Sequence, residues 1–494
     1  MGLSKSKIIA HRQCPKRLWL EMNQPSLAIY SESTEMNFQV GNRVGEVARE
    51  LFPEGSLIDG YVIEDVIPAT QAAISDAKPF FEGAFLHDEV LIRADLLLPR
   101  QSAYDLVEVK SSTRVKDVHV EDAAIQSWVV KGAGLPLSHT RIAHIDTSFV
   151  YAGDGNYDGL FEFADITAEV TELIEVVPEW VKQSKQTLAG DIPSVEPGDQ
   201  CYAPYDCPYQ GHCIGVEELV EGVYSPMVLP YRDGKALAAE LIEEGYDNLC
   251  DVPEDRLCKP KHQRIHRVSR SGVAELDDEA GNTLAELDYP RYFIDFETIN
   301  PAVPLWADTR PYQQIPFQWS CHIEHEDGSI THEEFLADGD QDPRRLFAQS
   351  LIETVGLEGP IFVYNAGFER SRVRELSQKY NDLSQSLDAL NERVVDLLPI
   401  AREHYYHPDM RGSWSIKAVL PTVAPELAYS DLEVGDGGMA MNAFAEMMEP
   451  GCDKQKNEEL RRALLEYCSL DTLAMVKLAH YFEGKNEDAE SKTQ

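Results

Sequence analysis

Asp95, Glu108 and Lys110 have residue types and a spacing that suit chemistry on a phosphate ester. Glu108 and Lys110 lie two positions apart in YDLVEVKSS, which has the composition of a strand, so both side chains would project from one face. Two carboxylates can hold a divalent metal ion that activates water. An ammonium beside them can orient that water or neutralise charge in the transition state. The set predicts metal-dependent hydrolysis of a phosphodiester bond.

A second set of acidic residues lies further along the chain. Asp295 and Glu297 interrupt the otherwise apolar strand pattern YFIDFETI and share one face of it. Tyr467 and Asp471 are one helical turn apart in a long helical pattern, and Glu369 follows the apolar stretch PIFVYNAGF. Buried carboxylates without a partner cost several kcal/mol, so ligation of metal ions is their natural compensation. Carboxylates that converge on two metals, with a tyrosine hydroxyl near the water, predict two-metal phosphodiester hydrolysis.

Four cysteines form a third candidate group. Cys14 stands alone near the start, whereas Cys201, Cys207 and Cys213 follow one another in CYAPYDCPYQGHC. Four thiols are the number that closes a tetrahedral metal or cluster site. Zinc is a structural alternative to an iron–sulfur cluster here, although the C-x5-C-x5-C spacing is unusual for zinc modules. The other cysteines have no ligand-like spacing, and an odd total of nine does not indicate a disulfide framework.

The secondary-structure patterns around these residues predict two separate α/β regions in the chain. Helical patterns cover residues 4–22, 38–51, 118–131 and 167–188, and strand patterns cover 84–99, 104–112 and 144–153. Strand patterns return at 291–299, in a hairpin that turns at Asp327-Gly328 and at 360–368, before a long helix. We therefore expect four segments: a first α/β domain at 1–215, a helical and basic connector at 216–288, a second α/β domain at 289–483 and a disordered tail at 484–494.

The composition limits how such a protein would meet nucleic acid. The 44 basic and 85 acidic residues give a net charge of −41, which repels a phosphate backbone overall. Basic runs at 5–17 and 256–270 could contact a strand or simply form solvated faces. No apolar stretch is long enough to span a membrane, and no secretory signal is evident. We expect a cytoplasmic protein with no membrane partner.

The first acidic set and the cysteines together resemble the PD-(D/E)XK nuclease superfamily. The resemblance is narrower to its RecB-like branch with iron–sulfur clusters, which includes CRISPR-associated and AddB-type nucleases. Arg93-Ala94-Asp95 matches motif II, Glu108-Val109-Lys110 matches motif III, and Gln126 in AAIQSWVV matches a downstream glutamine motif. The resemblance implies that Asp95 and Glu108 are metal ligands and that Lys110 and Gln126 act in catalysis.

The same resemblance assigns the cysteines and reveals one departure. Cys14 in HRQCPKRLWL matches the first ligand of the family's cluster. A structural [4Fe-4S] cluster is thereby implied, with ligands Cys14, Cys201, Cys207 and Cys213. The family usually has a histidine in motif I, but GNRVGEVARE places Gly45 there. Glu46 is the nearest substitute metal ligand.

The second acidic set resembles the DEDD exonucleases, an RNase H-like (DnaQ-type) family that includes the proofreading domains of DNA polymerases. Asp295 and Glu297 form its D-x-E motif, and Tyr467 and Asp471 form a Y-x3-D motif that selects the tyrosine (DEDDy) subclass. Glu369 stands where an aspartate is usual, and Asp396 in RVVDLLP competes with it as the third carboxylate. The resemblance implies 3′-5′ exonuclease activity with Mg2+ or Mn2+.

Taken together, these patterns predict a metal-dependent nuclease that acts on single-stranded DNA or, as a less favoured substrate, RNA. The alternative is a nucleic-acid-binding or scaffold iron–sulfur protein in which one or both sites are inert. The missing motif I histidine and the negative charge favour that alternative. Metal-dependent cleavage that is lost on substitution of Asp295 or Lys110 separates the two hypotheses.

Overall fold

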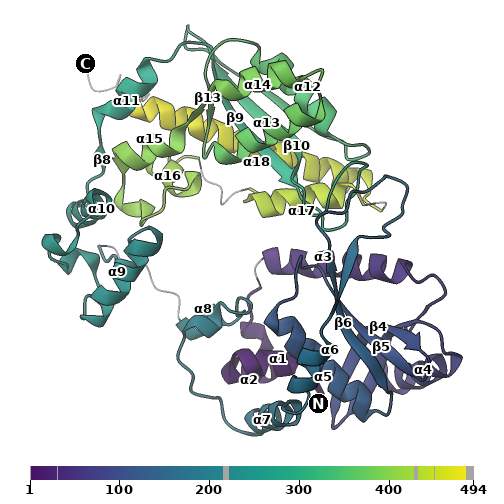
Figure 1. The fold of residues 1–494 in the computed structure, drawn as a ribbon. Coiled ribbons are helices and arrows are strands. Elements are labelled where there is room, and N and C mark those ends of the chain that lie inside the picture. Colours follow the sequence, from purple (N-terminus) through teal and green to yellow (C-terminus); the bar gives the residue numbers. More distant parts are fainter. Residues whose placement is uncertain (1, 31, 215–221, 428–431, 450, 486–494) are drawn as a thin grey trace. The chain divides into compact units, whose positions relative to one another are not determined.

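The computed structural model describes residues 2–30, 32–214, 222–427, 432–449 and 451–485 (Figure 1). The chain forms two compact units. The first contains Met1–Glu217 and Asn300–Gln313, and the second contains Glu218–Ile299 and Gln314–Gln494. The expected disordered tail falls, from residue 486 on, outside the described residues. No helix in the described ranges is long and apolar enough to cross a membrane.

The first unit is built on a seven-stranded mixed sheet. Its main order is β2-β3-β4-β5-β6-β7, and β1 pairs with β4. Pairing is antiparallel between β3, β4 and β5 and parallel between β5 and β6. The strands are β1 (Leu3–Ser4), β2 (Ser56–Leu57), β3 (Phe80–His87), β4 (Val90–Arg100), β5 (Ala103–Lys110), β6 (Leu137–Ile145) and β7 (Phe161–Asp165).

Helices cover both faces of this sheet. Consecutive residues of β5 therefore pack in two different cores, one on each face. Leu106 packs in a core with α1, α4, α5 and α7, whereas Val107 packs in a core with α3 and with Ala302 and Val303 of the 300–313 segment. The helices are α1 (Lys5–Gln13), α2 (Pro15–Asn23), α3 (Glu32–Glu50), α4 (Ile63–Asp76), α5 (Asp117–Gly132), α6 (Thr167–Leu173), α7 (Val177–Ala189) and α8 (Gln210–Ile214).

Three local expectations for the first unit were wrong in detail. The helix expected over 4–22 is interrupted at Cys14, whose extended φ of −160° agrees with the restriction that Pro15 places on its predecessor. The helix expected over 167–188 is two helices, α6 and α7. The strand expected over 144–153 is the end of β6, which stops at Ile145. The break at Cys14 matters most, because it turns this thiol out of a helix.

The second unit has a five-stranded sheet in the order β11-β10-β9-β12-β13. Three antiparallel strands, β11, β10 and β9, are continued by two parallel ones, β12 and β13. The strands are β9 (Arg291–Ile299), β10 (Ile315–Glu324), β11 (Ile330–Leu336), β12 (Ile361–Val363) and β13 (Val394–Asp396), with a separate pair formed by β8 (Glu275–Leu276) and β14 (Tyr405–Tyr406). The expected hairpin at Asp327-Gly328 is present as β10 and β11.

This sheet also carries helices on both faces (Figure 1). Phe293 of β9 packs in a core with α15, α16 and the long helix α18, and its neighbour Ile294 packs in a core with α12, α13 and α14. The helices are α9 (Tyr231–Glu243), α10 (Pro260–Ser271), α11 (Asp278–Ala285), α12 (Arg344–Val355), α13 (Gly367–Lys379), α14 (Ser384–Glu392), α15 (Leu397–His404), α16 (Ile416–Val423), α17 (Gly437–Met447) and α18 (Lys454–Phe482). The chain is thus of mixed α/β class.

The segment expected to be a connector, 216–288, packs with the second unit from residue 222 on. Its apolar residues Leu241, Leu257 and Ile265 belong to the same buried core as Phe293. Its basic run is largely matched by acids of its own region, and the ion pairs are Arg256–Glu244, Lys259–Asp233 and Arg267–Glu275. This run therefore offers less free positive charge than its sequence suggested.

Candidate metal centres and a four-cysteine pocket

Asp95, Glu108, Lys110 and Gln126 come together in the first unit. Asp95 lies within β4 rather than at its end, and its Oδ2 accepts a hydrogen bond of 2.8 Å from the Val109 N–H of β5. Glu108 is only 2% exposed, and its Oε2 accepts a hydrogen bond of 2.5 Å from Nε2 of Gln126 on α5. Strand alternation places Glu108 and Lys110 on one face of β5. The neighbouring strand β4 supplies Asp95, and helix α5 supplies Gln126.

Two further charged residues, Lys5 and Asp122, complete this first site. Nζ of Lys110 lies 2.7 Å from Oε1 of Glu108 and 2.7 Å from Oδ2 of Asp122. Nζ of Lys5, on α1, lies 2.7 Å from the same Glu108 oxygen. Sequence reasoning missed both residues, although Asp122 is one helical turn before Gln126 and so shares its face of α5. The ammonium groups of Lys5 and Lys110 thus balance the negative charge of Glu108 and Asp122.

The electrostatics of the first site follow from burial and from this balance. Burial opposes the charged form of Glu108, but Lys110 and Lys5 more than compensate and hold its pKa well below the usual range. Burial also acts against Lys110, and Glu108 and Asp122 raise its pKa overall. Burial and the charge of Glu108 raise the pKa of Asp95 to about 8. The pKa values of Glu108 and Asp95 are thus shifted in opposite directions, although the two carboxyl groups lie on neighbouring strands.

Glu46, the expected substitute for the motif I histidine, lies on α3 and pairs with Arg43 at 3.1 Å. Its side chain is 50% exposed, and its recorded partner belongs to its own helix rather than to the Asp95 and Glu108 group. An amphipathic helix gives its outward positions to solvent, which accounts for this placement. Arg93 of motif II donates to the carbonyl oxygens of Ile58 and Gly60, so it anchors the chain next to β2.

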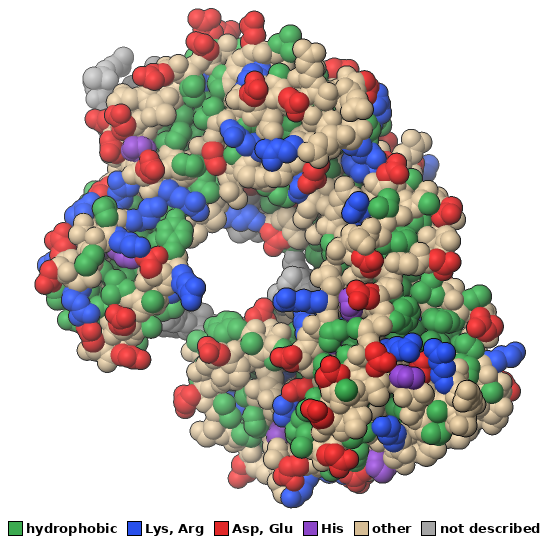
Figure 2. Space-filling model, in the orientation of Figure 1, with side chains coloured by type: hydrophobic (Ala, Val, Ile, Leu, Met, Phe, Trp, Pro, Cys, Tyr) green, Lys and Arg blue, Asp and Glu red, His purple; other side chains and the backbone are tan. Residues whose placement is uncertain are grey.

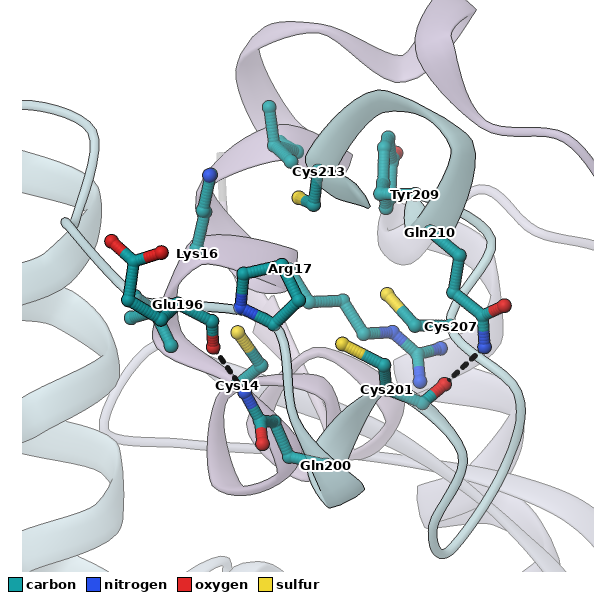
Figure 3. A pocket seen from close by; sticks show the side chains of 13 residues that line it. Cys14, Lys16, Arg17, Glu196, Gln200, Cys201, Cys207, Tyr209, Gln210 and Cys213 are labelled. Atoms are coloured by element: carbon teal, nitrogen blue, oxygen red, sulfur yellow. Dashed lines mark hydrogen bonds between the residues drawn. The ribbon is translucent and has the colours of Figure 1, made fainter. Parts of the chain in front are cut away.

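The four cysteines of the predicted cluster line one pocket (Figure 3). Cys14 enters it from the break between α1 and α2, and Cys213 enters it from α8. The loop that carries Cys201 and Cys207 is tied to the first helix, because Nε2 of Gln13 donates to the carbonyl oxygens of Gln200 and Tyr205, both at 2.7 Å. The chain thus brings Cys14 together with thiols that follow it by 187 to 199 positions.

The donor set of this pocket fits a thiolate-bound group. Burial raises the pKa of the Cys207 thiol, whereas the Tyr209 N–H and the Arg17 guanidinium act in the opposite direction. Lys16 and Arg17 both line the pocket. Four thiolates carry a large negative charge, which a neighbouring ammonium and guanidinium would offset. These features suit an iron–sulfur cluster and also a tetrahedral zinc ion.

The second unit brings Asp295, Glu297 and Asp471 together. One ligand oxygen of each lies within 4.8 Å of those of the others. Asp295 and Glu297 project from β9, the central strand of the sheet, and Asp471 comes from α18, which packs on that strand. Tyr467 lies one turn before Asp471 on α18 and is 4% exposed. Three carboxylates at this separation are the arrangement that holds a divalent metal ion.

Glu369 and Asp396 have different roles in this second site. Glu369 lies in the first turn of α13, is 4% exposed, and its Oε2 is buried without a hydrogen-bond partner in the described structure. Asp396 instead accepts hydrogen bonds from the backbone N–H groups of Asn365, Ala366 and Leu398, at 2.9, 3.0 and 3.0 Å. Asp396 thus fixes the turn before α13, at which Asn365 has a φ of +76°. This arrangement favours Glu369 as the remaining ligand.

The carboxylates of the second site oppose one another's ionisation. Burial and the charges of Asp471 and Glu297 raise the pKa of Asp295 well above its usual range. Burial and Asp471 raise the pKa of Glu297 to about 8, and burial raises that of Glu369 to about 7. Burial and Asp471 also raise the pKa of Tyr467, which therefore carries its proton under ordinary conditions. Ionisation of all these carboxylates together would concentrate negative charge, which a bound metal ion would neutralise.

The segment HYYHPDMRGSWSIKAVLP contains two histidines, an arginine and a lysine, and the lysine, Lys417, acts on these carboxylates. Its Nζ donates to the Gly435 carbonyl, lies 5.5 Å from the Tyr467 ring centroid and lowers the pKa of Glu297. The other three stabilise their surroundings. His404 pairs with Asp277, His407 caps a short 3-10 helix, and Arg411 donates to the Val223 carbonyl.

Comparison with known proteins finds a matching domain model and several similar proteins. Residues 292–415 match the model of a domain of unknown function, DUF2779. The chain is 24% identical over 254 residues to the uncharacterized protein UU173 of Ureaplasma parvum, a match that covers 47% of this chain and 36% of that protein. It is 25% identical over 224 residues to the MG366 homologue of Mycoplasma pneumoniae, covering 39% and 32%. The matches span about a third of the length of these uncharacterized relatives.

Proposed function

We propose that this protein is a divalent-metal-dependent nuclease with two separate hydrolytic sites. The observation that carries the proposal is the convergence of Asp295, Glu297 and Asp471 within 4.8 Å, from motifs that are far apart in the sequence. Their burial and mutual repulsion raise their pKa values, so either protons or a bound cation must offset their charge. Two-metal phosphodiester hydrolysis is the chemistry for which such a site is built.

In the second unit, Asp295, Glu297, Asp471 and Glu369 would hold Mg2+ or Mn2+. The bound ions would activate water and neutralise the phosphate oxygens. The protonated Tyr467 hydroxyl would orient that water, and Lys417 would add positive charge beside Glu297. A central strand and a packed long helix that both supply carboxylates support an RNase H-like, DEDDy-type assignment. By that resemblance we propose 3′-5′ exonuclease action.

In the first unit, Asp95 and Glu108 would hold a metal ion in a PD-(D/E)XK-type site. Lys110 is bonded to Glu108 and would orient the attacking water or stabilise the charge that develops on the phosphate. Gln126 holds the second oxygen of Glu108 and so fixes the direction of the carboxylate. The ion pairs around Glu108 support this proposal, since they place an ammonium next to a metal-binding carboxylate.

The four-cysteine pocket would hold a [4Fe-4S] cluster with a structural role. The group would join the start of the first unit to its end, because Cys14 and Cys213 lie at those two ends. Anaerobic purification should yield about four iron atoms per chain, and Cys207→Ser should remove them. One zinc ion per chain with no iron would instead identify the alternative, tetrahedral site.

Single-stranded nucleic acid is the substrate that the charge favours. The net charge of −41 opposes tight binding to a long duplex, and acidic side chains are spread over the visible face of both units (Figure 2). Bound metal ions would offset this field at the sites themselves. We favour single-stranded DNA over RNA as the substrate.

The experiment that tests the proposal uses anaerobically purified protein and end-labelled single-stranded DNA and RNA with Mn2+. Wild type is compared with Lys110→Ala and Asp295→Ala. Loss of different products in the two variants would support two nuclease sites and would show the preferred nucleic acid. Binding without cleavage under Mg2+ and Mn2+ would overturn the proposal in favour of a binding or scaffold protein.

A further inference from the structure

Glu82, in β3, lies across from Asp95 of the first site. The flanking residues pair as Phe81 with Leu96 and Gly83 with Ala94, so Glu82 and Asp95 occupy the position between these pairs. Neither residue belongs to a loop, because the register continues on both sides. Glu82 is therefore the residue of β3 next to Asp95, a proposed metal ligand on β4. Sequence analysis did not single out Glu82, because the motif residues Asp95 and Glu108 lie on β4 and β5 rather than on β3.

The backbone of Glu82 is unusual for a strand. Its φ is +56°, in the left-handed region that favours glycine, and residues with side chains reach this region mostly in turns. Strained conformations of this kind cost about 1 kcal/mol or more, and they concentrate at functional sites. The next residue is Gly83, which could adopt a positive φ without this conformational cost. The local conformation therefore holds a carboxylate where glycine would fit more easily.

The carboxylate of Glu82 forms ion pairs with two arginines at distances longer than those of hydrogen bonds. Arg49 and Arg93 lie at 3.7 and 3.9 Å from its two oxygens, both beyond hydrogen-bond distance, and the side chain is 32% exposed. Burial raises the pKa of Glu82; Arg93, Arg49 and then Lys5 lower it, and Glu108 raises it. Lys5 and Glu108 belong to the first site, so Glu82 lies within electrostatic reach of that site.

Two buried oxygen atoms beside the first site have no hydrogen-bond partner in the described residues. Gln126 is fully buried and donates to Glu108, but its Oε1 has no hydrogen-bond partner in the described structure. Oδ1 of Asp122, in the same cluster, is also buried and unpartnered. Buried acceptors without donors cost about 1–3 kcal/mol each. Water molecules held by a metal ion would supply the missing donors.

We propose that Glu82 is the third carboxylate of the first metal site, the role first considered for Glu46. This inference rests on the proposed function of the first unit, with Mg2+ or Mn2+ as the ligand. Asp95 and Glu108 would bind the ion from β4 and β5, and Glu82 would complete the set from β3. A glutamate from the sheet would then replace the histidine that Gly45 leaves absent.

The test is Mn2+ binding to the full chain, measured by electron paramagnetic resonance of free Mn2+. Asp295→Asn and Asp471→Asn are combined as a background in which the second site is disabled. On this background, Glu82→Gln keeps the length and shape of the side chain, and Glu46→Gln is the control that removes the same charge. We expect Glu82→Gln to weaken the remaining Mn2+ site about tenfold or more, and Glu46→Gln to change it less than about twofold.

The outcomes separate the two levels of the proposal. If Asp95→Asn abolishes Mn2+ binding but Glu82→Gln does not weaken it, Glu82 is only an ion-pair partner of Arg49 and Arg93, and this inference is wrong. If Asp95→Asn also leaves binding unchanged, the first unit has no such metal site, and its proposed function fails as well. Thermal unfolding of each variant shows whether the fold is retained.

Discussion

The two acidic sites bury similar numbers of carboxylates but neutralise them in opposite ways. In the first site, Lys5 and Lys110 contact Glu108 directly and hold it ionised. In the second, Asp295, Glu297 and Asp471 mainly raise one another's pKa values. The first site thus keeps its charged arrangement without metal, whereas the second stores repulsion that protons or metal ions must relieve. A fold can therefore offset the charge of a buried acidic site with neighbouring lysines, or it can leave that charge to be offset by protons or metal ions.

The largest expected effect is on catalysis in the second site. Asp471→Asn removes one of the proposed metal ligands, so exonuclease activity on end-labelled single-stranded DNA should fall by at least about 10³-fold. Glu466→Gln, an exposed neighbour on α18, is the matched control and should retain activity. Digestion at the wild-type rate by Asp471→Asn would remove the second site from the proposed function.

Because the two sites balance their charges differently, substitutions at Glu108 and at Asp295 should have different effects on the free energy of unfolding. Glu108→Gln leaves Lys5 and Lys110 to share Asp122 as their remaining carboxylate partner, so the free energy of unfolding should fall, by about 3 kcal/mol. Asp295→Asn relieves repulsion and should leave the metal-free protein equally or more stable. Urea unfolding in the presence of a chelator measures both. Equal destabilisation by the two substitutions would show that the sites do not differ in this way.

The pH dependence of the metal-free protein should reflect the second site. Glu297 and Glu369, with pKa values raised to about 8 and about 7, bind more protons folded than unfolded between roughly pH 4.5 and 8. Stability of the second unit should therefore decrease as the pH rises through this window, and Mn2+ should restore it at the alkaline end. Thermal unfolding with and without Mn2+ measures this, and stability that instead increases with pH would contradict the raised pKa values.

The smallest expected effect concerns Lys417. Replacing it by methionine removes a charge that lowers the pKa of Glu297, so the acid limb of the exonuclease pH profile should move upward by less than about one unit. Lys417→Arg keeps the charge and should restore the wild-type profile. An unchanged profile in Lys417→Met, with activity lost only through lower stability, would limit this residue to its contact with the Gly435 carbonyl.

Much of the second site was predictable because its geometry is local. Asp295 and Glu297 alternate on β9, and Tyr467 and Asp471 repeat on one face of α18. The choice between Glu369 and Asp396 was not local. It depended on three backbone N–H groups that only the folded turn directs at Asp396.

In the first unit the sequence determined the pair Glu108 and Lys110, since a strand's two-residue period holds wherever the strand lies. The cause of the break at Cys14 is also in the sequence, since Pro15 disfavours a helical conformation of its predecessor, but the helical pattern over 4–22 did not predict it. The tertiary structure alone decided that Lys5 would reach Glu108, that Glu46 would lie exposed on α3 and that Glu82 would lie across from Asp95. Local periodicity fixes which residues share a face, whereas only packing fixes which faces meet.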